Sequence, residues 1–240
     1  MALHFLVDDA SAAAGDDLVI TGAEAHHAAV VRRVRPGEEV TVGDGAGLWL
    51  TGTVTSAAPK EVVVHVTDAV TFAPASPRLV LAQALAKGDR DELAVQAATE
   101  LGVDAIIPWQ AARSVSRWSH DKAVKGVARW SAIVREAAKQ AHRAWVPAVA
   151  SPVSTAQLAG REGMLLVLEP TASTRLSEID LPSDADIVLI VGPEGGIAPD
   201  ELAALEDAGA TLVRLGDTVL RTSTAGPAAL ALASARLGRW

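Results

Sequence analysis

The sequence predicts an α/β protein with a small N-terminal β-barrel and a larger C-terminal domain around a mostly parallel sheet. Three observations support this fold class. Short apolar runs, separated by turns containing Gly, Asp and Pro, fill roughly the first 70 residues. From residue 79 onward, apolar runs of strand length alternate with helical patterns. Between the two parts, residues 72–77 contain two prolines in four residues, which a central strand does not tolerate.

The N-terminal domain is expected to span residues 1–72, followed by a linker at 73–78. Its strands are expected at 18–20, 39–42, 48–54 and 61–66, and one short helix at 23–33. Residues 43–47 are expected to connect two strands as a hairpin rather than to bind phosphate, because no helical pattern follows them.

The C-terminal domain, residues 79–240, is expected to alternate strands and helices. The strands are expected at 79–85, 103–108, 164–169, 187–191 and 211–215, and the helices at 89–101, 122–143, 199–208 and 225–237. Leu93, Ala97 and Leu101 should form the buried face of the first helix. The strand at 187–191 is continuously apolar, which is typical of a strand buried on both faces.

Composition and charge limit the function classes. The chain has no cysteine, which excludes disulfides, zinc–thiolate sites and a cysteine nucleophile. It shows neither a signal peptide nor an apolar stretch of about 18 residues, so we expect a cytoplasmic protein. The net charge is −8, but residues 113–145 carry eight basic side chains against two acidic ones, with Trp118, Trp130 and Trp145 among them. This local excess favours an RNA partner, although a solvated amphipathic helix gives the same pattern.

Two strand-to-helix loops near the C-terminus carry the strongest functional signal. Val191-Gly192-Pro193-Glu194-Gly195-Gly196 closes one apolar run, and Leu215-Gly216 begins the second loop, which ends in Arg221-Thr222-Ser223-Thr224. Glycines at strand ends let a ligand approach the backbone closely, so the pair predicts a pocket for a nucleotide-like cofactor. The alternative is a pair of tight turns with no ligand.

Common nucleotide motifs are absent from these loops. No Gly-Lys-Ser/Thr follows, and the Gly-x-Gly-x-x-Gly spacing is missing, so kinase and dehydrogenase interpretations lose their support. Arg221 stands at a helix entrance, where the helix dipole disfavours a cation, which favours a role in binding an anion. Thr222, Ser223 and Thr224 are candidate helix caps. Glu169 could cap a strand end or bond a ligand hydroxyl.

Taken together, these residues resemble the RsmE family, the 16S ribosomal RNA uridine-N3 methyltransferases of the SPOUT superfamily. The resemblance covers nearly the whole chain. It rests on the segments His26-His27, Arg32-Arg33-Val34-Arg35-Pro36-Gly37, Lys87-Gly88-Asp89-Arg90, Thr99-Glu100-Leu101-Gly102-Val103, Glu136-Ala137-Ala138-Lys139-Gln140, Gly192-Pro193-Glu194-Gly195-Gly196 and Leu220-Arg221-Thr222.

The resemblance implies a PUA-like β-barrel, a trefoil-knotted methyltransferase domain, a homodimer, S-adenosylmethionine as methyl donor without a metal, and 16S rRNA of the small subunit as substrate. Arg221 and Glu194 would serve catalysis. The cofactor would be held by Leu168, Glu169, Gly192, Gly195, Gly196, Leu215, Gly216 and Leu220. RNA would be contacted by His27, Arg32, Arg33, Lys87, Arg90, Arg113, Arg129 and Arg143.

One position departs from the family pattern. Many members have Glu where this chain has Ser223, so a mechanism that uses that Glu as a base does not carry over. The competing hypothesis is a non-catalytic RNA-binding protein. A metabolite enzyme acting on a small acid would lack a catalytic pair.

Overall fold

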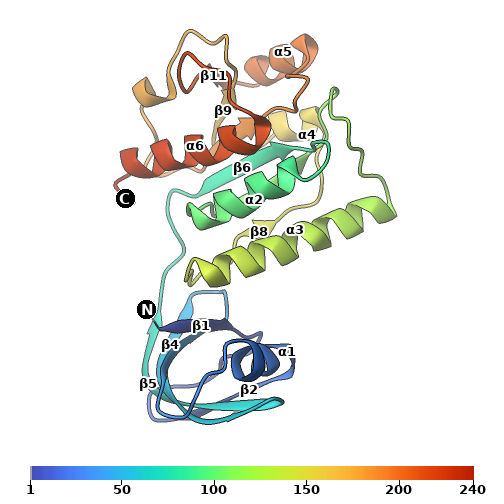
Figure 1. The fold of residues 1–240 in the computed structure, drawn as a ribbon. Helices are drawn as coiled ribbons and strands as arrows, with labels where there is room; N and C mark the ends of the chain where they lie inside the picture. Colours follow the sequence, from blue (N-terminus) through green and yellow to red (C-terminus); the bar gives the residue numbers. More distant parts are fainter. Residues whose placement is uncertain (1) are drawn as a thin grey trace. The chain divides into compact units, whose positions relative to one another are not determined.

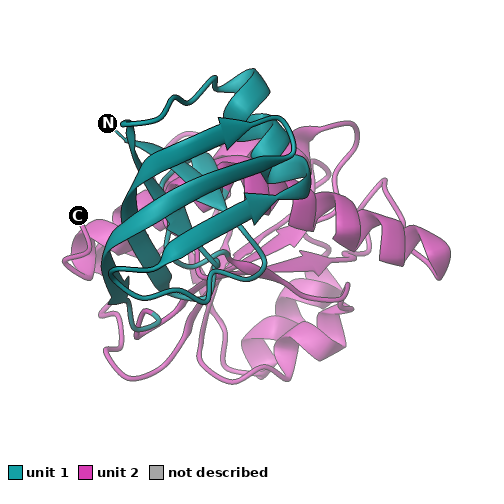
Figure 2. Cartoon of the chain, turned by 90° about the horizontal axis from the view of Figure 1, so that it is seen from below, with its two compact units in different colours: residues 1–74, 138–146 teal, residues 75–137, 147–240 magenta. Residues whose placement is uncertain are grey.

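The computed structural model describes residues 2–240, which divide into two compact units (Figure 2). Unit 1 comprises the residues up to 74 together with 138–146, and unit 2 comprises 75–137 and 147–240. No helix among the described residues is both long and apolar enough to span a bilayer.

Unit 1 is a curved five-stranded sheet with a short helix (Figure 1). The strand order is β1-β3-β4-β5-β2, and only the β1–β3 pair is parallel. The elements are β1 (Leu3–Leu6), β2 (Asp17–Thr21), α1 (Gly22–His26), a π-helical turn (His27–Val31), β3 (Glu39–Gly43), β4 (Leu48–Ala58) and β5 (Glu61–Thr71). The four expected strands and the hairpin are present, whereas β1 was not predicted. β4 and β5 are longer than predicted because their outer ends are exposed and lack the apolar alternation.

The end of the long helix and the residues after it belong to unit 1. Gly47 N donates to Ala144 O at 3.0 Å, and Val146 N donates to Gly45 O at 2.9 Å. Gly47 has φ +105°, and a Cβ there would lie 2.8 Å from the Trp145 ring. The 43–47 hairpin therefore has to be glycine-rich to receive this segment.

Unit 2 is a six-stranded sheet in which every pair is parallel, in the order β11-β9-β10-β6-β7-β8. In Figure 1, α2 and α6 lie on one face of the sheet and α4 and α5 on the other. The elements are β6 (Leu79–Ala84), α2 (Arg90–Glu100), β7 (Ala105–Trp109), α3 (Asp121–Gln140), β8 (Ala148–Val149), α4 (Thr155–Ala159), β9 (Met164–Leu168), a 3-10 turn (Leu176–Glu178), β10 (Ile187–Val191), α5 (Pro199–Asp207), β11 (Thr211–Val213) and α6 (Thr222–Arg236).

Two predictions about the helices of unit 2 were wrong. Leu93 is 50% exposed, and α2 instead buries Ala94, Val95 and Ala98. Small residues face inward because α2 packs closely against α6. The second error concerns α6, which begins at Thr222 rather than at residue 225, because its hydroxyl residues continue the helix instead of preceding it.

Unit 1 contains one buried histidine, His4, among the described residues. His4 is 6% exposed, its ring stacks on Trp49 at a centroid distance of 4.2 Å, and its Nδ1 lies 2.9 Å from Thr41 Oγ1. Burial, with further contributions from the nearby His142 and Lys139, lowers the pKa of His4 to about 4.

We predict that His4 makes the stability of the protein depend on pH. Between pH 6.5 and about 4 the unfolded chain protonates this ring while the folded chain does not, so the free energy of unfolding falls as the pH is lowered through this window. A shift of this size corresponds to a loss on the order of 3 kcal/mol. His4→Phe keeps a ring on Trp49 and removes the titration, so urea unfolding at several pH values should show a flatter profile. The exposed His26→Ala is the control, and an unchanged pH slope in His4→Phe would contradict this assignment.

Candidate active site

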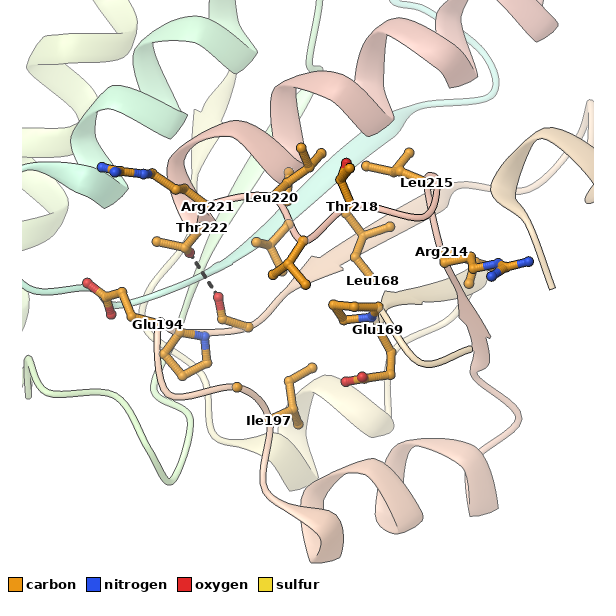
Figure 3. A pocket seen from close by; sticks show the side chains of 18 of the residues that line it. Leu168, Glu169, Glu194, Ile197, Arg214, Leu215, Thr218, Leu220, Arg221 and Thr222 are labelled. Atoms are coloured by element: carbon orange, nitrogen blue, oxygen red, sulfur yellow. Dashed lines mark hydrogen bonds between the residues drawn. The ribbon is translucent and has the colours of Figure 1, made fainter. Parts of the chain in front are cut away.

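The candidate site lies where three parallel strands of unit 2 end. Leu168, the last residue of β9, is in register with Val191 at the end of β10 and with Val213 at the end of β11. The loops after these strands enclose a pocket of about 350 Å³ (Figure 3). Its volume and its position at the carboxyl ends of parallel strands are typical of a small-molecule site.

Seven of the eight residues predicted to hold a cofactor line this pocket: Leu168, Glu169, Gly192, Gly196, Leu215, Gly216 and Leu220. The eighth, Gly195, belongs to the same loop but not to the lining. Glu194 and Arg221, the two predicted catalytic residues, also line the pocket, as does Arg90, which was predicted to contact RNA.

The loop after β10 needs its glycines. A Cβ on Gly192 would lie 2.6 Å from Ile197 Cγ1, so any side chain there would displace the pocket wall. Gly196 has φ +71° and donates from its N–H to Pro193 O at 2.9 Å, which closes a tight turn. The loop therefore presents backbone groups to the pocket.

Two charged side chains outside the pocket hold this loop. Arg113 Nη1 donates to Gly195 O at 3.1 Å, so this predicted RNA contact is a loop support in the structure. Glu201 is buried, with 7% exposure, and its carboxylate accepts from Ala112 N at 2.9 Å, Thr155 Oγ1 at 2.5 Å and Ala198 N at 3.4 Å. Glu201 was not among the residues predicted for the site.

Glu194 connects the pocket loop to the start of α2. Its Oε1 accepts from Lys87 N at 3.0 Å and from Arg90 Nη1 at 3.2 Å. Burial alone would raise the pKa of Glu194, but the hydrogen bonds from backbone N–H groups and from Arg90 outweigh it and lower that pKa. Glu194 is therefore a firmly ionised carboxylate that is already hydrogen-bonded.

Arg221 is the exposed N-cap residue of α6, and its side chain makes no capping bond. Among the described residues no carboxylate pairs with it. In Figure 3, Arg221 and Glu194 lie at one end of the pocket, and Arg214 lies at the other. The expectation that Thr222 caps the helix was wrong: its hydroxyl instead donates to Gly192 O at 2.8 Å, because the residue already stands in the first helical turn.

Carboxylates around the other end of the pocket are also engaged. Glu169 Oε1 accepts from Thr171 N and Thr171 Oγ1 at 3.2 and 2.9 Å. Asp217 lies between Arg214 and Arg175, at 3.4 and 3.6 Å. Glu169 thus does what was expected of a strand-end cap, while it remains on the pocket wall.

The residues predicted to contact RNA belong to both units, and some of them form ion pairs within the protein while others do not. His27, Arg32, Arg33 and Arg143 belong to unit 1, and Lys87, Arg90, Arg113 and Arg129 belong to unit 2. Arg129 forms a bidentate pair with Glu92, at 2.6 and 2.7 Å. Arg32, Arg33 and Lys87 are exposed, and within residues 2–240 their side chains have no ion pair.

The aromatic and cationic pattern of the long helix α3 was partly misread. Trp130 is 1% exposed and packs edge-on against Trp118, which itself covers Gly126, so these rings belong to the packing and are not offered to RNA. Lys139 is 5% exposed and pairs with Glu24 at 3.4 Å. Trp130, Val134 and Ala138 form the buried face of α3.

Comparison with known families defines the class of the protein. A family model for an RNA methyltransferase domain matches residues 74–234, and a model for an RNA methyltransferase PUA domain matches residues 20–67. The fold is thus that of an RNA methyltransferase, and the expected α/β methyltransferase domain with an N-terminal PUA-like domain is confirmed.

Similar proteins specify the family. The chain is 45% identical over 229 residues to ribosomal RNA small subunit methyltransferase E of Mycobacterium bovis, covering 92% of this chain and 87% of the relative. It is 33% identical to the Bacillus subtilis protein of that name, with coverage of 86% and 85%. The Neisseria gonorrhoeae enzyme of that name, crystallised with S-adenosylmethionine, matches with a TM-score of 0.87, 30% identity and 98% of both chains covered. The chain belongs to the ribosomal RNA small subunit methyltransferase E family.

We predict that Glu201→Gln destabilises unit 2. The amide keeps one acceptor oxygen but turns an NH2 group toward a backbone N–H, and a buried donor without a partner costs about 1–3 kcal/mol. Urea unfolding should show this loss relative to Glu206→Gln, an exposed position on the same helix. Equal stabilities of the two variants would contradict the role assigned to Glu201.

Proposed function

We propose that this protein transfers the methyl group of S-adenosylmethionine to N3 of one uridine in 16S rRNA. The observation that carries the proposal is the pocket at the ends of β9, β10 and β11, with the unpaired Arg221 at its edge, in a chain of this family. A non-catalytic RNA-binding role is not favoured, because it would leave the pocket without a use.

The pocket fits the methyl donor. Its apolar walls, which include Leu168, Ile197 and Leu220, suit an adenine ring, and the loop glycines expose N–H and C=O groups for the ribose and methionine parts. We assign the cofactor contacts to the backbone at Leu168, Gly192, Gly196, Leu215 and Leu220, with Glu169, Gly195 and Gly216 beside them. When bound, the sulfonium supplies an electrophilic methyl group.

Arg221 is assigned to the methyl acceptor. Methylation replaces the N3 proton of uridine: the proton passes to water, and the negative charge left behind spreads over N3, O2 and O4 of the ring. N3 then bonds to the methyl carbon as the carbon–sulfur bond breaks and S-adenosylhomocysteine leaves. A guanidinium with no carboxylate partner can donate hydrogen bonds to that charge, and it does so without first breaking an ion pair. Arg221 and the cofactor loops lie on one pocket, which holds donor and acceptor together.

Glu194 is assigned to loop orientation. A carboxylate that accepts from Lys87 and Arg90, and whose pKa is lowered, is a weak proton acceptor. Its contacts join the cofactor loop to the start of α2, so its contribution to catalysis would be to keep the loop in place.

We assign RNA binding to residues 1–72 and to basic residues of both domains, with 73–78 as linker and 79–240 as methyltransferase domain. The unpaired cations Arg32, Arg33 and Lys87 suit phosphate contacts best, and we assign His27, Arg90 and Arg143 to further RNA contacts. Because the substrate is ribosomal, we place the protein in the cytoplasm. We also propose that it is a homodimer, as the family resemblance implies.

We also propose that the backbone of the pocket is a trefoil knot. β11 pairs with β9 on one side, and on its other side Arg214 pairs with residues 174–176 of the loop that leaves β9. The connection from β9 to β10 thus passes around β11. The chain that continues from β11 to α6 would then run through this connection, which supports a knot.

We predict that Arg221→Ala slows methyl transfer by about two to three orders of magnitude and leaves S-adenosylmethionine binding within a few-fold of wild type. Loss of one charge-stabilising donor costs about 10²–10³ in rate. A strain lacking the gene should lose one methyluridine when its 16S rRNA is mapped by mass spectrometry. The wild-type gene and the exposed-arginine control Arg161→Ala should restore it, and Arg221→Ala should not. Restoration by Arg221→Ala would refute the role of Arg221, and an unchanged map in the deletion strain would refute the proposed reaction.

We predict that replacing an unpaired basic residue reduces the salt dependence of RNA affinity more than replacing one that already forms an ion pair. Replacing Arg32, Arg33 or Lys87 with Ala removes one phosphate contact each, so the slope of log affinity against log salt should fall by about 0.7–0.9 per residue. Arg129→Ala, which breaks the pair with Glu92, should change that slope little. Filter binding with 16S rRNA fragments at several salt concentrations measures both, and equal slopes for all variants would contradict the assignment.

A further inference from the structure

Gln83 is the penultimate residue of β6 and is fully buried beside the end of β10. Its register partner on β10 is Val191, the residue before Gly192. Gln83 Nε2 donates to Ala84 O at 3.2 Å and to Thr222 Oγ1 at 2.9 Å. Thr222 Oγ1 in turn donates to Gly192 O at 2.8 Å, the bond drawn in Figure 3. Three segments far apart in the sequence are thereby joined by two consecutive hydrogen bonds.

Chemistry sets the direction of these bonds. A carbonyl can only accept, so the single proton of the Thr222 hydroxyl goes to Gly192 O. The hydroxyl oxygen must therefore accept from its other neighbour, and the Gln83 amide must present its NH2 group. Both N–H donors of Gln83 are used in this arrangement.

The unpaired Oε1 of Gln83 indicates that this position is occupied by glutamine for its N–H donors. Gln83 Oε1 is buried and has no hydrogen-bond partner among the described residues. An unpaired buried oxygen costs free energy, which a leucine of similar size would avoid. A role in core packing alone would be served better by that leucine.

The hydrogen bonds of Gln83 and Thr222 connect the loop assigned to the methyl donor with the residue assigned to the methyl acceptor. Gly192 opens the loop assigned to the cofactor, and Thr222 directly follows Arg221, which is assigned to the uridine. We propose that Gln83 is a positioning residue for methyl transfer, which acts through Thr222 to hold Arg221 in register with the cofactor loop. This inference rests on the proposed function for its catalytic part and on the bonds above for its structural part.

The test combines two nearly isosteric variants with a rescue. Gln83→Leu removes the donor, Thr222→Val removes the hydroxyl, and Thr222→Ser keeps it. Gln96→Leu, at an exposed glutamine on α2, is the matched control. Three quantities are measured: amide hydrogen exchange in residues 192–197 and 216–224, affinity for S-adenosylmethionine by calorimetry, and single-turnover methyl transfer to 16S rRNA.

We expect Gln83→Leu and Thr222→Val to accelerate exchange in both loops and to slow single-turnover transfer by about 10- to 100-fold, since a displacement near 1 Å costs that much. The dissociation constant for S-adenosylmethionine should change less than about fivefold. Thr222→Ser should behave like wild type, and the double variant should be no slower than either single one, because all act on one connection.

The proposal is overturned if Gln83→Leu leaves exchange and transfer at wild-type values, or if the effects of the two variants multiply. It is also overturned if Thr222→Ser is as slow as Thr222→Val, since the hydrogen bonds of the hydroxyl would then not be what holds Arg221 in place. A wild-type protein that transfers no methyl group would refute the proposed function instead, and the exchange data would still decide whether Gln83 holds both loops.

Discussion

The parallel register of β9, β10 and β11 is the constraint on which the rest of the site depends. It brings Leu168, Val191 and Val213 to one edge of the sheet, so three loops from distant parts of the chain enclose one pocket. β10 can occupy the middle of this arrangement because all five of its residues are buried and apolar. A change of register would separate the loops, whatever residues they contained.

Within the site, ligand binding and loop support are carried by different groups. The pocket walls offer glycine backbone and apolar side chains, and the groups that hold them stand outside, as Arg113 and Glu201 do. Glu194 and Arg90 neutralise each other at one end. Arg221 is thereby left as a cation with no partner among residues 2–240, which is the charge that a ring losing a proton requires.

The sequence was informative where the signal is local. The apolar runs and glycines around residues 187–196 predict a strand, a turn and a ligand-facing loop, and these are present. It misled where a partner lies far away in the chain. Arg129 was predicted to contact RNA, but Glu92, 37 residues earlier, pairs with it. The residues around Gln83 do not indicate that a hydroxyl 139 residues later accepts a hydrogen bond from its amide.

Calorimetric titration of the wild-type protein with S-adenosylmethionine tests most directly whether the pocket holds the methyl donor. We expect saturable binding with one site per chain, weakened in Gly192→Ala because the added Cβ meets Ile197. Absence of binding in a folded protein that still binds 16S rRNA would contradict the account and favour a non-catalytic RNA-binding protein.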